Sequence, residues 1–142
     1  MKSKNFIIFF LLLLTKNIQA EDLTIQAKNI TLDKDGMTSV FKGDVVIKSN
    51  EKIIKSNYAK YNKKTGKILI QENILAEDNK GNTIEAEKAE YDENTKILKT
   101  EGITKIITSE KYVLNGSDIL INNEKKFISS AEDSILTDLD GN

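Results

Sequence analysis

The chain has 142 residues, a formal net charge of −1, and no histidine, cysteine or proline. This length fits one domain, and without imidazole or thiol groups the common nucleophile–base pairs and soft metal sites cannot be assembled. The charge balance and the lack of arginine argue against a nucleic-acid-binding protein, which needs a basic face.

Residues 1–20 have the pattern of a secretory signal peptide. Lys2 and Lys4 precede an apolar run of nine residues, 6–14, and polar residues follow as far as Ala20. Nine residues are too few to span a bilayer, which takes about 20, so we expect cleavage after Ala20 and export of the mature chain. Cleavage removes three lysines and no acidic residue, which leaves 18 basic against 22 acidic residues and a net charge of −4.

A repeat with a period near 30 residues organises the mature chain. Small or apolar residues recur at offsets 0, 2, 5 and 7 in four segments, 25–32, 54–61, 84–91 and 114–121. The anchors Ile25, Ile54, Ile84 and Leu114 are 29, 30 and 30 residues apart. A fixed step of this size is the signature of a repeat architecture.

The spacing within each copy predicts a kinked β-strand. Offsets 0 and 2 share one face of a strand, as do offsets 5 and 7, but an odd step separates the two pairs. One inserted residue or a bulge would return all four to the same face and bend the strand. A helix also brings offsets 0 and 7 together, but the small and β-branched residues and the closely spaced turns favour a strand.

A second strand type lies between these copies, clearest at Phe41-x-Gly43-x-Val45-x-Ile47. Its counterparts are at 71–75, 100–106 and 131–137. The residues equivalent to Gly43 are Asn73, Gly102 and Asp133, at steps of 30, 29 and 31 residues. Gly, Asn and Asp at this point predict a bulge or an unusual backbone angle. Short turns between the strands favour antiparallel hairpins, so the chain is expected to be all-β, with two strands per repeat.

A sheet built in this way has open ends. An exposed edge strand pairs with another chain unless something blocks it, and the sequence contains no proline that could do so. Lys42, Lys48 and Lys60 provide partial protection, or they simply solvate the outer face.

Other candidate chemistry is weak, and no metal or cofactor is expected. Glu85 with Glu87, or Glu87 with Asp92, could be offered as the two carboxylates of a glycosidase, but alternating Glu and Lys usually form the solvent face of a strand. The segments 33–36 and 138–141 resemble the start of a calcium loop, yet neither has the downstream glutamate that such a loop requires. Both are expected to be turns.

The ordered features resemble the OstA-like (LptA) family of lipopolysaccharide-transport proteins. They are the export signal, the opening segment 23–33, the Phe41-Lys-Gly43-Asp44-Val45 strand and the Ile-x-Ala-x-x-Ala-x-Tyr repeat. The family includes the periplasmic bridge protein LptA and the N-terminal domain of the outer-membrane assembly protein LptD. The resemblance implies an OstA-like domain over residues 21–142.

The resemblance implies a twisted, V-shaped antiparallel β-jellyroll with an apolar groove that holds the acyl chains of lipopolysaccharide. It also implies a non-enzymatic role in the periplasm, lipopolysaccharide as ligand, and edge-strand stacking with other OstA-like domains of the bridge. The groove-lining positions that it implies are Phe41, Val45, Ile47, Ile54, Ala59, Tyr61, Leu75, Ile84, Ala86, Ala89, Tyr91, Ile106, Leu114, Ile119 and Ile121.

Two alternatives remain open at this point. The chain stops on a turn signal at 138–142, so we expect a C-terminally truncated piece of an LptD-type protein, with a barrel in the outer membrane, more than a free-standing bridge that reaches this membrane indirectly. The alternative function is that of an exported structural or adhesive β-repeat protein, which would bind other proteins through its edge strands.

Overall fold

The computed structural model describes residues 23–122, 124–138 and 140–142. The predicted signal peptide, residues 1–20, lies outside them. The described residues form the strands β1 (Thr24–Gln26), β2 (Asn29–Leu32), β3 (Thr38–Lys48), β4 (Lys52–Asn62), β5 (Lys67–Asp78), β6 (Thr83–Asp92), β7 (Ile97–Ile107), β8 (Val113–Ser117), β9 (Ile119–Asn122), β10 (Phe127–Ser130) and β11 (Ile135–Thr137). Within this part of the chain, no helix has the length and apolar content needed to cross a bilayer.

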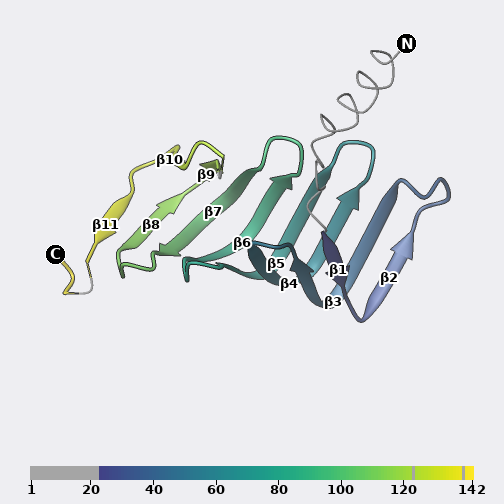
Figure 1. Ribbon diagram of the computed structural model, residues 1–142, viewed down its shortest axis with the longest axis horizontal. Helices are drawn as coiled ribbons and strands as arrows, with labels where there is room; N and C mark the ends of the chain where they lie inside the picture. Colours follow the sequence, from purple (N-terminus) through teal and green to yellow (C-terminus); the bar gives the residue numbers. More distant parts are fainter. Residues whose placement is uncertain (1–22, 123, 139) are drawn as a thin grey trace, which may run out of the picture.

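The strands form one antiparallel sheet in which neighbours in sequence are mostly neighbours in space. The order is β1-β3-β4-β5-β6-β7-β8-β11, with β2 also pairing β3, β9 pairing β7, and β10 pairing β9. Figure 1 shows the long strands side by side, with β2 near one end of the molecule and β11 near the other. The all-β antiparallel prediction is confirmed.

A line of kinks divides this sheet into two wings. The first wing holds β2, β9, β10 and the strand halves 38–42, 58–62, 67–71, 88–92 and 97–101. The second wing holds β1, β8, β11 and the halves 45–48, 52–56, 74–78, 83–86 and 103–107. Each of the strands β3 to β7 crosses from one wing to the other.

The predicted kinks are real bulges. The register shifts between Lys42 and Val45 in β3, and comparable shifts occur in the pairings β4 with β5, β5 with β6, and β6 with β7. Gly43, Asn73 and Gly102 have positive φ angles of 77°, 54° and 76°, as the sequence pattern predicted.

The prediction for Asp133 is wrong. Asp133 lies between β10 and β11, outside any strand, and has no positive φ angle. The left-handed residue at this end of the kink line is Asp118 (φ 51°), which separates β8 from β9.

The terminal copies of the repeat break at the kink instead of bending through it. Segment 25–32 contains β1 and β2, segment 114–121 contains β8 and β9, and the second-type segment 131–137 contains only β11. Within segment 114–121 the break is the single residue Asp118. Its backbone N–H donates to the Gly102 carbonyl (3.3 Å) and its carboxylate accepts from the Gly102 N–H (2.9 Å), so the two short strands stay attached to β7.

Gly102 offers a direct test of the kink. A Cβ placed there would meet nothing within 4 Å, so Gly102→Ala changes only the cost of the left-handed backbone. We expect it to lower the free energy of unfolding by about 1 kcal/mol, measured by urea denaturation. Gly102→Asn should cost less, because asparagine tolerates this conformation, as Asn73 does with φ 54°. Equal losses for both variants would contradict the assigned strain.

Candidate functional site

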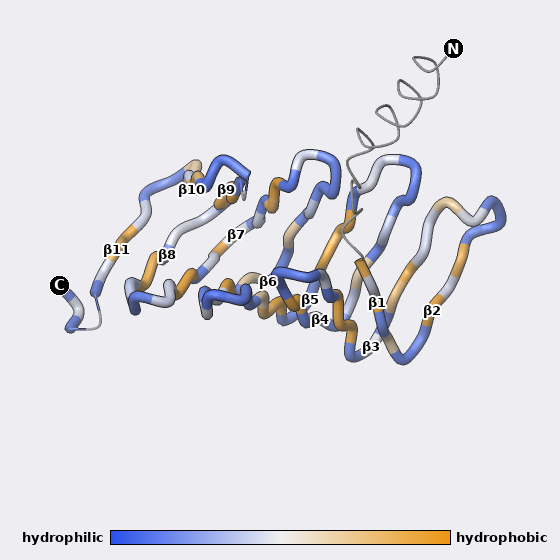
Figure 2. Tube along the Cα trace, viewed as in Figure 1, coloured by the Kyte–Doolittle hydropathy of each residue, from blue (hydrophilic) through white to orange (hydrophobic). Residues whose placement is uncertain are grey.

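Alternate residues of both wings point to one side of the bent sheet, which we call the inner face. Ile68 and Ile70 of the first wing and Val45 and Ile47 of the second wing are all 2% exposed or less. One side of a sheet can be buried to this degree only if another layer covers it, and a single apolar cluster contains residues of both wings. The two wings therefore pack against each other. In Figure 2 the turns at the margins of the wings are mostly hydrophilic, whereas apolar residues lie along the strands.

One aliphatic row crosses the whole second wing. Cross-strand pairing aligns, in order, Ile25, Ile47, Ile54, Ala76, Ile84, Ile106, Leu114 and Leu136. Ile47, Ile54, Ala76 and Ile106 are buried and Ile84 and Leu114 are half-buried, whereas Leu136 on the last strand is 61% exposed. The row is thus continuous from one edge of the sheet to the other.

A second row crosses the first wing. Its members are Leu32, Ser39, Tyr61, Ile68, Tyr91, Leu98, Ile121 and Ile128. Leu32 and Ile128, at its two ends, are 65% and 47% exposed. The first-wing row therefore has exposed apolar side chains at both ends, whereas the second-wing row has one at Leu136 and begins at the half-buried Ile25.

Three buried hydroxyl side chains lie next to the kink line on the inner face, Ser56, Thr100 and Thr104. The Thr104 hydroxyl lies 2.7 Å from the Thr100 hydroxyl, which accepts a hydrogen bond from the Ile119 N–H (3.0 Å). Ser56 donates to the Tyr58 carbonyl (3.1 Å). Among the described residues, no buried side-chain polar atom lacks a hydrogen-bond partner, so the polar groups of the interior are already satisfied.

Polar contacts occur where the inner face reaches its margin. The Tyr61 hydroxyl donates to the Glu93 carboxylate (2.9 Å). Burial raises the pKa of Tyr61 above its ordinary value, and the hydrogen bond and the charge of Glu93 raise this pKa further. The tyrosine therefore stays neutral at physiological pH and presents its ring to the interior.

The structure places all but one of the predicted groove-lining residues on the inner face. Those that are buried or half-buried there are Phe41, Val45, Ile47, Ile54, Ala59, Tyr61, Ile84, Ala86, Ala89, Tyr91, Ile106, Leu114, Ile119 and Ile121. That these residues contact lipid stays a prediction.

Leu75 is the exception. It lies on the outer face, 41% exposed, opposite Lys55 and Glu85. The sequence alignment of the repeats paired Gln71 with Phe41, but the residue in line with Phe41 across Ala59 is Ile70. Since side chains alternate along a strand, this one-residue error moved Leu75 to the wrong face.

The same error hid several inner-face residues of β5. Ile68, Ile70, Ile74 and Ala76 are buried there but were absent from the prediction, as was Leu98 of β7, which precedes the predicted segment 100–106. The pairs 68 with 70 and 74 with 76 each show the two-residue alternation of a half-buried strand, which would have identified them had the bulge at 72–73 been placed correctly.

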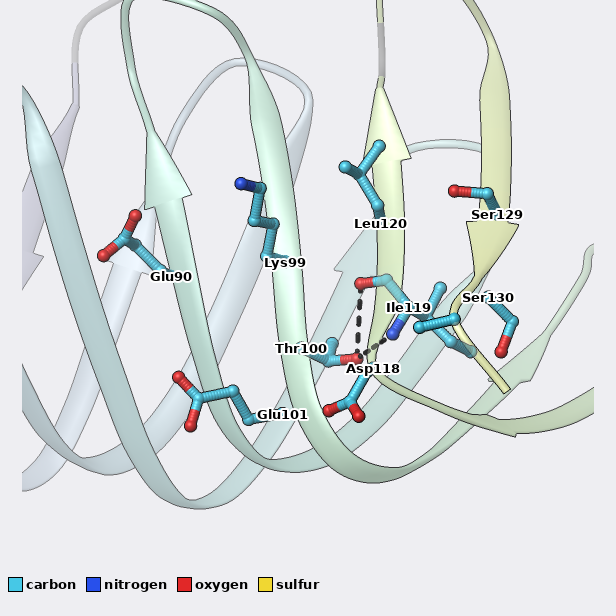
Figure 3. Close-up of a pocket in the computed structure, with 10 residues that line it drawn as sticks. Glu90, Lys99, Thr100, Glu101, Asp118, Ile119, Leu120, Ser129 and Ser130 are labelled. Carbon is cyan, nitrogen blue, oxygen red and sulfur yellow. Dashed lines mark hydrogen bonds between the residues drawn. The ribbon is translucent and has the colours of Figure 1, made fainter. Parts of the chain in front are cut away.

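A hollow of about 420 Å³ lies between β7, β9 and β10 (Figure 3). Its wall includes Glu90, Lys99, Glu101 and Asp118. Glu90 is paired with Lys67, whose Nζ lies 2.9 Å from Glu90 Oε1. A charged wall does not suit an apolar ligand, so the apolar rows are the better candidate site.

The carboxylates considered for a hydrolase are not arranged for that chemistry. Glu85 faces solvent opposite Lys105, and Glu87 is exposed at the bulge of β6. Asp92 accepts a hydrogen bond from the Asn94 N–H (2.8 Å), and this bond lowers the pKa of Asp92, whereas a general acid needs a raised pKa. Nor do the described residues contain a cluster of three or more metal-ligating side chains.

The fold and the inner face define a class of protein: an open-ended, V-shaped antiparallel β-jellyroll with an apolar interior. The chain belongs to the LptA/(LptD N-terminal domain) LPS transport protein family, whose model matches residues 24–127. The family resemblance seen in the sequence is thereby confirmed.

Solved structures give the same fold. The chain is similar to LptH, the LptA homologous periplasmic component of the lipopolysaccharide transport device from Pseudomonas aeruginosa, with a TM-score of 0.74. The identity is 13%, and the match covers 82% of this chain and 94% of LptH. A comparison with curated proteins found no match.

Proposed function

We propose that this protein is a periplasmic conduit that holds the acyl chains of lipopolysaccharide along its inner face and passes the lipid toward the outer membrane. The observation that carries the proposal is the pair of apolar rows, one along each wing, which reach exposed side chains at Leu32, Ile128 and Leu136. A pocket for one small ligand would be closed at its ends, whereas a path for a lipid needs an entrance and an exit. The export signal over residues 1–20 and a domain over 21–142 belong to the same proposal.

Binding of acyl chains follows from the chemistry of the rows. Removing apolar surface from water is favourable by about 0.8 kcal/mol for each buried CH₂ group. The two rows offer aliphatic and aromatic side chains to an acyl chain, and neither row contains a charged residue. Sugars would remain in water, because the outer face carries ion pairs such as Lys88 with Glu101 and Lys67 with Glu90.

Loading requires the two wings to separate, since their own side chains now fill the interior. The kink line provides a hinge in this proposal. Its left-handed residues, Gly43, Asn73 and Gly102 among them, interrupt the ladders, so a change of angle there need not break the hydrogen bonds within either wing. A lipid that binds only the opened form would shift the population toward it.

Hand-over between domains would use the ends of the sheet. The outermost described strands, β1 and β2 at one end and β10 and β11 at the other, pair on one side only in this chain. Unpaired strand edges accept a further strand, and Ile30 and Ile128 carry apolar side chains there. Other OstA-like domains of the bridge are the proposed partners.

Site-specific photo-crosslinking tests the proposed lipid path. Ile84 and Glu85 are neighbours in β6, but Ile84 belongs to the inner row and Glu85 faces outward between Leu75 and Lys105. We expect a photo-reactive residue at position 84, as at 54 and 114, to capture lipopolysaccharide in cells. The same residue at position 85 should capture at least about tenfold less, since it reaches only solvent.

The alternative of a structural or adhesive protein predicts a different pattern. It draws on the same exposed edges, so purified protein would self-associate without capturing lipid, and depletion would leave surface lipopolysaccharide unchanged. Equal labelling at positions 84 and 85 would remove the support for a lipid path.

A further inference from the structure

The hollow of about 420 Å³ between β7, β9 and β10 has a wall unlike the apolar rows (Figure 3). Part of this wall is a cross-strand row on the outer face of the first wing, directly behind the inner row that ends at Ile128. In order across the strands, the outer row contains Glu90, Lys99, Leu120 and Ser129. The hollow therefore opens on the outer face, and its volume lies in the range of small-molecule sites.

Three carboxylates of the wall each keep an oxygen that a ligand can use. Lys67 contacts Glu90 through Oε1. Lys88 contacts Glu101 through Oε2. Asp118 accepts from a backbone N–H of β7 through Oδ1 (2.9 Å), which fixes its carboxylate beside the hollow. Within the part of the chain that the structure describes, the second oxygen of each carboxylate accepts no hydrogen bond.

The same wall offers a cationic donor and an apolar contact. The Lys99 ammonium forms no ion pair with any described residue, and Leu120 beside it is half-buried. Hydroxyl groups can donate to the carboxylates and accept from the ammonium, and C–H groups can pack on the leucine. An anion would meet three carboxylates, and an acyl chain would meet charges. The wall therefore suits a neutral sugar ring.

We propose that this hollow binds a neutral sugar of the lipid whose acyl chains lie along the first-wing row. The inference rests on the proposed function. Ile128 ends that row with 47% of its surface exposed, and the next residue, Ser129, lines the hollow on the opposite face of β10. Among the described strands β10 pairs only with β9, so a headgroup that leaves the row at Ile128 reaches the hollow around the free edge of β10. A strand added at this edge would displace the sugar, so docking of a further domain there releases the headgroup.

The test compares lipopolysaccharide with lipid A, which keeps the acyl chains but lacks the core sugars, in binding to the purified mature protein. Wild-type protein should bind lipopolysaccharide about tenfold more tightly, the size of effect that one charge-assisted hydrogen bond gives. Lys99→Met keeps the length of the side chain and removes the donor, so it should lose this preference while still binding lipid A. Asp118→Asn keeps the acceptor for the backbone N–H but replaces the free oxygen by a donor, so it should weaken the preference as well.

Lys60→Met is the matched control. Lys60 is an exposed lysine in line with Glu90 across Leu69 on the same outer face, but it does not line the hollow. This variant should keep the wild-type preference for lipopolysaccharide.

The core oligosaccharide released from the same lipopolysaccharide distinguishes a sugar linked to lipid from a free one. It should shift the NMR signals of the Lys99, Leu120 and Ser129 amides, yet bind at least about a hundredfold more weakly than the intact lipid, because it lacks the acyl chains that hold it in place. A free oligosaccharide that binds as tightly as the intact lipid would overturn the link with the lipid path. Inorganic phosphate at the same concentration should leave these signals unchanged, and shifts caused by phosphate would show an anion site instead.

The outcomes separate this inference from the conduit proposal. If Lys99→Met keeps the wild-type preference, or if the oligosaccharide shifts only signals away from the hollow, the inference is overturned although the conduit proposal stands. If wild-type protein binds neither lipid, the conduit proposal falls and the inference with it.

Discussion

Ile68→Ala is expected to lower the free energy of unfolding by about 2–5 kcal/mol. Ile68 is fully buried on the inner face of β5, between Tyr61 and Tyr91 of the neighbouring strands. Its truncation removes apolar contacts and leaves a cavity between the wings. Because β5 is hydrogen-bonded to β4 on one side and to β6 on the other, the sheet can collapse only partly around this cavity. Urea denaturation followed by circular dichroism measures the loss.

Ile103→Ala is the matched control for this experiment. Ile103 is also an isoleucine in a long strand, but it lies just after the β7 kink and is 85% exposed. Its truncation should change stability by no more than about 0.5 kcal/mol. Similar losses for the two variants would mean that the inner face is not the core of the protein.

The kinked strands could be predicted because the residue spacing within each strand determines where the kink must lie. The odd step between offsets 2 and 5 of segments 54–61 and 84–91 means that one extra residue is needed to keep the apolar side chains on one face. The structure has bulges at those places in β4 and β6. Gly43 and Gly102 mark the same line on the intervening strands with positive φ angles. Alternation and turn chemistry thus predicted both the strand type and the bend.

Strand register was harder to predict, because it depends on contacts between strands. Aligning Asn73 with Gly43 was plausible by spacing, but β5 has two left-handed residues, Glu72 and Asn73, and only the pairing with β4 shows which one is equivalent. The consequence was the wrong face for Leu75 and the omission of Ile70. A bulge of unknown position leaves such an error undetected by periodicity alone.

The terminal copies are split because of the number of neighbouring strands, which the local sequence pattern does not show. Segments 25–32 and 54–61 share the same offsets, yet the first forms β1 and β2 and the second forms β4. The central strand is held by ladders on both sides, whereas β1 and β2 pair only with β3 among the described strands. Without a second neighbour, nothing aligns the two pieces across the kink.

Position within the stack therefore explains how one repeat serves two purposes. In the centre, paired strands close the wings over Ile47, Ile68 and Tyr91, which are each at most 4% exposed. At the ends, short split strands leave Leu32 and Leu136 open to water. The proposed conduit would need both a stable middle and accessible ends, and one repeat pattern provides both.

Thr100→Val is expected to destabilise the end of the sheet that carries β9 and β10. The Thr100 hydroxyl accepts from the Ile119 N–H at 3.0 Å, a contact drawn in Figure 3, and lies 2.7 Å from the Thr104 hydroxyl. Valine has nearly the same shape but no acceptor, so it leaves a buried N–H and the Thr104 hydroxyl without this partner. We expect a loss of about 1–3 kcal/mol in the free energy of unfolding.

Amide hydrogen exchange at Ile119 separates this local effect from a general loss of stability. In Thr100→Val the Ile119 amide should exchange at least about tenfold faster, because local opening of β9 no longer breaks a hydrogen bond to residue 100. Thr100→Ser keeps the acceptor and loses only a methyl group, so it should leave this exchange rate close to that of the wild type. Since β9 and β10 build the first wing at one end of the apolar path, protection of Ile119 that did not change in Thr100→Val would mean that the ladder with β10, and not the buried hydroxyl pair, holds this end in place.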